Sequence, residues 1–101
     1  MTTHPSTSVL IIEDEPRARQ RLADAIEAQD GLTLLGTRED YASGLEALLS
    51  LKPRILLQDL GLPDGDGADI IRAIAKEGLD TEAMVITVFG DEKHVVDALA
   101  A

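Results

Sequence analysis

The fold is decided by the stretch Ile55-Leu56-Leu57-Gln58-Asp59-Leu60-Gly61-Leu62-Pro63-Asp64-Gly65-Asp66-Gly67. Its apolar start is typical of a buried parallel strand, and the glycines and proline that follow are typical of a tight loop. Asp59 therefore stands where the predicted strand ends. In α/β proteins, the carboxyl ends of the strands are where ligands bind.

A second apolar run, Val9-Leu10-Ile11-Ile12, ends in Glu13-Asp14-Glu15. If the two runs are neighbouring parallel strands, Glu13 and Asp14 lie at the same edge of the sheet as Asp59. Three carboxylates in one small space repel each other unless a cation joins them, and oxygen ligands of this kind suit Mg²⁺. Glu15 is instead expected to favour the positive end of the helix that follows.

Outward from these two runs, strand patterns alternate with helix patterns. Strands are predicted at residues 9–12, 32–37, 55–59 and 84–88, and helices at residues 16–29, 41–51 and 67–77 and from about residue 92. Such alternation is typical of a parallel sheet with helices on both faces. The fold class is therefore α/β.

Each predicted helix carries an apolar stripe at helical spacing, which we expect to face the core. The stripes are Ala18, Leu22, Ala25 and Ile26; Leu45, Leu48 and Leu49; Ile70, Ile71 and Ile74; and Val95, Val96 and Leu99. Pro16 is expected at the start of a helix, Gly31 and Gly78 after helix ends, and Lys52-Pro53 where the second helix stops.

Composition limits the classes of function. The chain has 101 residues, enough for one domain, and a formal charge of -10, which argues against nucleic acid or an anionic membrane as a direct partner. It has no cysteine and no apolar run long enough to span a membrane, so a cytoplasmic location is expected. Residues 1–8 are expected to form a disordered tail, and residues 9–101 a single domain.

Three motifs, in this order and at these strand ends, carry a family resemblance. They are Glu13-Asp14 after the first strand, Asp59 with its loop after the third, and Thr87 near the end of the fourth. With them the chain resembles the receiver domain of two-component response regulators, which has the CheY-like flavodoxin-type fold, a doubly wound parallel sheet. The segment Thr87-Val88-Phe89-Gly90-Asp91-Glu92 is similar to receivers of the NarL/FixJ group, which usually precede a DNA-binding domain.

The resemblance implies a role for each of these residues. Asp59 would be the phosphoacceptor, and Glu13, Asp14, Asp59 and the main-chain carbonyl of Gly61 would hold Mg²⁺, with Mn²⁺ as the alternative ion. The hydroxyl of Thr87 would sense the phosphoryl group. The donor would be a sensor histidine kinase, and the chain would be a phosphoacceptor rather than a turnover enzyme. Transcription would be regulated through an output domain that this sequence does not contain.

The sequence departs from the family pattern at its end. Receivers continue into a fifth strand that ends in a lysine, and then into a fifth helix, whereas this sequence stops at Ala101. The expected sheet order is therefore 2-1-3-4, with the fifth strand and fifth helix missing. The fourth strand would then be an open edge, and we expect self-association or exchange of segments between chains through it.

Two other functions are compatible with parts of the pattern. One is an interaction module that works without phosphorylation, through the open edge of the sheet. The other is a phosphohydrolase of the haloacid dehalogenase type, which also uses a strand-end aspartate and Mg²⁺. That class needs a second aspartate two residues after the first, where this chain has Gly61, so it ranks last.

Overall fold

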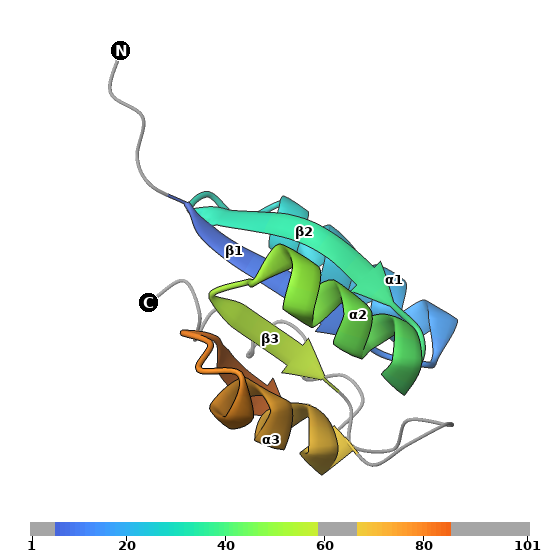
Figure 1. Ribbon diagram of the computed structural model, residues 1–101. Coiled ribbons are helices and arrows are strands. Elements are labelled where there is room, and N and C mark those ends of the chain that lie inside the picture. The colour runs from blue at the N-terminus through green and yellow to red at the C-terminus, as the bar shows by residue number, and fades with distance from the viewer. Residues whose placement is uncertain (1–5, 59–66, 86–101) are drawn as a thin grey trace.

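Four parallel strands form the centre of the molecule. The computed structural model describes residues 6–58 and 67–85. The strands are β1 (Thr7–Ile12), β2 (Leu32–Arg38), β3 (Ile55–Gln58) and β4 (Glu82–Val85), and they lie in the order β2-β1-β3-β4 (Figure 1). All three pairings are parallel, so the predicted fold class and strand order are confirmed.

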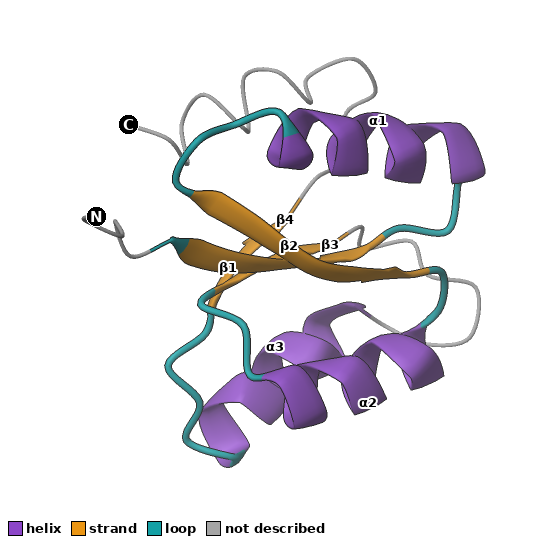
Figure 2. Ribbon diagram, turned by 90° about the horizontal axis from the view of Figure 1, so that it is seen from above, coloured by secondary structure: helices purple, strands orange, loops and turns teal. Residues whose placement is uncertain are grey.

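Helices cover both faces of this sheet. Helix α1 (Pro16–Glu27) lies on one face, and α2 (Tyr41–Leu51) and α3 (Gly67–Lys76) lie on the other (Figure 2). The helix predicted from about residue 92, and residues 86–88 of the predicted fourth strand, fall outside the described residues.

The core consists of two apolar clusters, one on each face of the sheet. Successive side chains of a strand point to opposite faces, so the unbroken apolar runs of β1 and β3 supply both clusters. The cluster under α1 contains Val9, Ile11, Leu22, Ala23, Ile26 and Leu57. The cluster under α2 and α3 contains Leu10, Ile12, Ala47, Leu48, Leu56 and Ile70.

The helix ends follow local sequence signals. Pro16 occupies the start of α1, as predicted. Gly78 has a φ of +64° just beyond α3, and the Leu79 N–H donates to the Ile74 carbonyl at 3.0 Å, which satisfies a carbonyl of the last turn. Helix α2 stops at Lys52, which adopts the left-handed conformation with a φ of +48°, directly before Pro53.

Two members of the predicted apolar stripes do not face the core. Leu49 is 39% exposed and Ile71 is 38% exposed, so the prediction was wrong for both. Helix α2 instead presents its small residues to the sheet, with Gly44 and Ala47 buried beside Leu48. The reason is geometric: the line of closest approach runs through positions i, i+3 and i+4, and Leu49 lies about 100° around the helix from Leu48.

Candidate functional site

The candidate site lies where β1 and β3 end. The two strands pair in register, and their last residues, Ile12 and Gln58, are partners. Glu13 and Asp14 follow Ile12 in the chain, and Asp59 follows Gln58. The sequence-based prediction that both acidic motifs follow neighbouring parallel strands therefore agrees with the sheet.

Two of the five predicted site residues lie in the described part of the chain. Glu13 and Asp14 do, whereas Asp59, Gly61 and Thr87 fall outside it, so the roles of these three stay predictions. The side chain chemistry of Glu13 and Asp14 fits a hard divalent cation, because carboxylate oxygens are the ligands that Mg²⁺ takes from proteins.

Glu13 and Asp14 differ in their surroundings. Glu13 is 7% exposed, and its N–H donates to the carbonyl of Arg38 at 2.9 Å, which continues the pairing with β2 past the end of β1. Asp14 is exposed to solvent. Of the acidic pair, Asp14 is therefore the residue whose carboxylate is open to ions in solution.

Glu15 caps the helix that follows, as the sequence predicted. Its carboxylate accepts a hydrogen bond from the Ala18 N–H at 2.5 Å. This bond lowers the pKa of Glu15 below its usual value of 4.5, and the nearby Arg21 and Arg17 lower it further. The carboxylate is thereby committed to the first turn of α1.

Sequence reasoning missed Arg19, which lies beside the acidic pair. Its guanidinium donates to the Glu13 carbonyl at 2.9 Å and to the Asp14 carbonyl at 3.4 Å. The only signal available in the sequence was an arginine one turn into the helix after Glu13-Asp14, and such a residue usually belongs to a solvated helix face.

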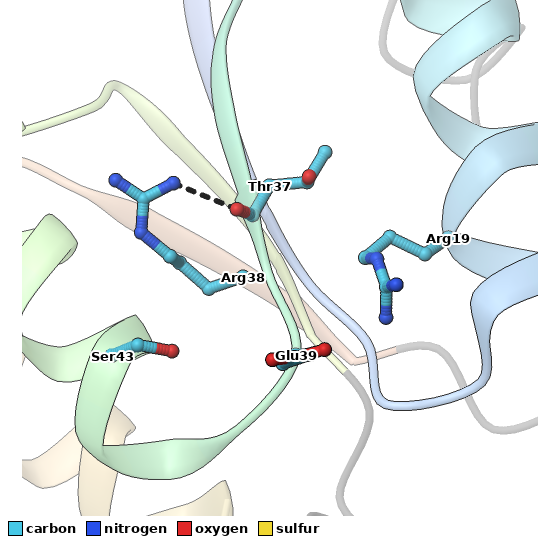
Figure 3. A pocket seen from close by; sticks show the side chains of 5 residues that line it. All are labelled: Arg19, Thr37, Arg38, Glu39 and Ser43. Atoms are coloured by element: carbon cyan, nitrogen blue, oxygen red, sulfur yellow. Dashed lines mark hydrogen bonds between the residues drawn. The ribbon is translucent and has the colours of Figure 1, made fainter.

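A pocket of about 330 Å³ opens next to this arginine, lined by Arg19, Thr37, Arg38, Glu39 and Ser43. Figure 3 shows Arg19 on one side of the end of β2, and Arg38 and Ser43 on the other side. Arg38 donates to the Thr37 carbonyl at 2.7 Å. The guanidinium of Arg19 therefore borders a polar, open space rather than the apolar core.

Asp40 caps α2 and was also missed. It accepts hydrogen bonds from the Ser43 hydroxyl at 2.6 Å and from the Ser43 N–H at 2.8 Å. Both bonds lower the pKa of Asp40 below its usual value of 3.8, and the bond from the Ser43 hydroxyl has the larger effect. Asp40 is thus the N-cap residue of α2, the helix that packs against Ile12.

The lowered pKa of Asp40 predicts an acid-dependent loss of stability. Because the carboxyl is more acidic in the folded chain, its stabilisation is complete above the unfolded pKa and disappears as the pH falls through the folded pKa. Asp40→Asn cannot lose a charge there. We expect the urea midpoint of the wild type to fall more than that of Asp40→Asn between about pH 6 and about pH 3. Equal falls in both chains would contradict this.

Comparisons with known proteins agree with the fold. The response regulator receiver domain family matches residues 9–101. The KDP operon transcriptional regulatory protein KdpE of Escherichia coli is 36% identical over 95 residues, which are 94% of this chain and 41% of that protein. The nitrate/nitrite response regulator protein NarL of the same species is 27% identical over 99 residues, which are 98% of this chain and 46% of that protein.

Solved structures give the same fold. The signal receiver domain of the putative response regulator NarL from Mycobacterium tuberculosis superposes with a TM-score of 0.80 at 22% identity, covering 97% of this chain and 81% of that one. None of the described helices is both long and apolar enough to cross a membrane.

The chain spans less than half the length of KdpE and NarL of Escherichia coli. With a match over nearly its whole length, the chain belongs to the response regulator receiver domain family of two-component systems.

Proposed function

We propose that the chain accepts a phosphoryl group on Asp59 from a sensor histidine kinase. Glu13, Asp14, Asp59 and the main-chain carbonyl of Gly61 would hold Mg²⁺ or Mn²⁺, and Thr87 would respond to the phosphoryl group. The register of β1 with β3 carries the proposal, because it ends the two strands side by side directly before the acidic pair and Asp59. Membership of the receiver family supports it.

The proposed chemistry is a transfer between two nucleophiles. A carboxylate oxygen of Asp59 attacks the phosphorus of a phosphohistidine, the P–N bond breaks, and the imidazole leaves with its electron pair. The product on this chain is an acyl phosphate. Bound Mg²⁺ supplies positive charge that offsets the crowded oxygens of this step. The Thr87 hydroxyl then donates a hydrogen bond to the new dianionic group, and the loop that carries Thr87 shifts with it.

The rest of the proposal concerns the whole protein. Relatives such as KdpE carry transcriptional regulation in their names and are more than twice the length of the matched region. We propose that residues 9–101 are the receiver of such a protein and that an output domain regulates transcription in the cytoplasm. Strand β1 begins at Thr7, so the tail expected over residues 1–8 is wrong for Thr7 and Ser8, which pair with β2.

Titration with Mg²⁺ tests the metal site directly. Asp14→Asn removes a charged ligand, so we expect the dissociation constant for Mg²⁺ to rise at least about tenfold in calorimetry. The control is Asp30→Asn, which removes one exposed carboxylate between α1 and β2. Asp30 precedes β2 and so lies toward the amino ends of the parallel strands, whereas Asp14 follows the carboxyl end of β1. Equal affinities in wild type and Asp14→Asn would contradict the site.

A second candidate is a protein interaction module that works without phosphorylation. Within the described residues, β4 pairs with β3 along one edge only, and Val85 on that strand is 36% exposed. An unpaired strand edge is a template for another chain. Self-association that rises with concentration, and that is the same with and without Mg²⁺ and with Asp59→Asn, would favour this candidate over phosphoryl acceptance.

A further inference from the structure

The loop between β1 and α1 is held from both sides at Glu13. The Glu13 N–H donates to the carbonyl of Arg38 at 2.9 Å, and the Glu13 carbonyl accepts from the Arg19 guanidinium, also at 2.9 Å. The same Nη1 atom lies 3.4 Å from the Asp14 carbonyl. The peptide groups of both acidic residues are therefore anchored, while the Asp14 side chain remains open to solvent.

The anchor comes from a residue that is itself firmly placed. The Arg19 N–H donates to the Glu15 carbonyl at 2.9 Å, and the Glu15 carboxylate caps the same turn. Side chains on a helix lean toward its N-terminus, so an arginine in the first turn lies over the loop that leads into the helix. Its planar group carries several donors, which allows one side chain to serve two neighbouring carbonyls.

Simple electrostatics argues against an arginine at this place. A permanent positive charge close to Glu13 and Asp14 repels a divalent cation that approaches them. The charge is useful there only if the hydrogen bonds to the two carbonyls contribute more to metal binding than the repulsion costs. The two effects have opposite signs, which makes them separable by experiment.

We propose that Arg19 is a positioning residue for the metal site: it holds the main chain of Glu13 and Asp14 so that their carboxylates are aimed before the cation arrives. This inference rests on the proposed function. Residues that orient ligands without touching the metal commonly change its affinity by about 10–100-fold.

Arg19→Met tests the proposal, because methionine has a stem of similar length and no donor. We expect the dissociation constant for Mg²⁺ to rise about tenfold. The matched control is Arg17→Met, which removes the same charge from an exposed position in the same turn of α1. Loss of a positive charge alone should leave the affinity for Mg²⁺ unchanged or raise it. We therefore expect Arg17→Met to bind Mg²⁺ as tightly as the wild type or more tightly, and Arg19→Met to bind it more weakly.

A second measurement needs no metal. In the metal-free chain, heteronuclear relaxation of the Glu13, Asp14 and Glu15 amides should show faster local motion in Arg19→Met than in the wild type or Arg17→Met. Arg19→Lys should restore part of the affinity and part of the rigidity, because an ammonium reaches the carbonyls without the planar fork. It also serves in place of Arg19→Met if that variant does not fold.

The outcomes are distinguishable. Arg19→Met that binds Mg²⁺ as tightly as the wild type, or Arg17→Met that weakens as much as Arg19→Met, would overturn the role of Arg19 and leave the proposed function intact. A wild-type chain with no Mg²⁺ binding would overturn the proposed function and the positioning role with it.

Discussion

Asp59→Asn is expected to abolish the incorporation of a phosphoryl group. The wild type, incubated with Mg²⁺ and a small phosphoryl donor such as phosphoramidate or acetyl phosphate, should gain the mass of one phosphoryl group per chain. Asparagine has the shape of aspartate but an amide in place of the nucleophilic carboxylate, so the attack on phosphorus cannot occur. Intact-mass spectrometry of the two chains, treated in parallel, measures the difference.

The control for this experiment is Asp64→Asn. Asp64 belongs to the same sequence stretch and carries the same charge, but it stands five residues after Asp59 in the sequence. We expect it to incorporate the phosphoryl group as the wild type does. A mass gain that persists in Asp59→Asn, or that disappears in Asp64→Asn but not in Asp59→Asn, would show that the phosphoacceptor has been assigned to the wrong residue.

The positions of the strands and helices could be predicted because the signals for them are local. Pro16 at the start of α1 and Pro53 after α2 each fix one backbone angle and remove one donor, whatever the rest of the chain does. Gly78 after α3 adopts the positive φ that ends the helix, which glycine does without a steric penalty. The strand order was not local information. It came from the family resemblance, and the sheet confirms it.

The faces of the helices were harder to predict than their ends. An apolar stripe read from the sequence gives weight to large side chains, and so included Leu49 and Ile71. A helix packs closest where its side chains are smallest, and in α2 that place is Gly44 and Ala47. Which residues approach the sheet depends on the distance between layers, and spacing along one segment does not contain that distance.

Some residues of the candidate site could likewise be predicted from a local sequence pattern, and others could not. Glu13 and Asp14 could be found because they end an apolar strand, which is a pattern along the chain. Arg19 and Asp40 act through hydrogen bonds to the main chain and to a helix start. Arg19 reaches the carbonyls of Glu13 and Asp14 only in the folded chain, so its role depends on the path of the loop between β1 and α1.

Gly44→Ala is expected to destabilise the chain, although alanine is the better helix former. A Cβ built on Gly44 would lie 2.5 Å from Cδ1 of Ile12 and 3.0 Å from its Cγ1. Ile12 is fully buried in the cluster under α2 and α3, so its side chain has little room to move. At an exposed helix position the change would stabilise by about 1 kcal/mol. Here we expect a loss of about 1–3 kcal/mol in the free energy of unfolding by urea.

The clash can be tested with its partner. Ile12→Val removes Cδ1, the atom nearest to the new Cβ, so the cost of Gly44→Ala should be smaller in the Ile12→Val background than in the wild type. Additive effects of the two changes, or a stabilised Gly44→Ala chain, would contradict the close approach of α2 to β1. Ile12 is the residue before Glu13, so we expect a displacement of Ile12 to shift the acidic pair as well. Gly44→Ala should therefore weaken Mg²⁺ binding without altering any proposed ligand, and Ile12→Val should restore part of it.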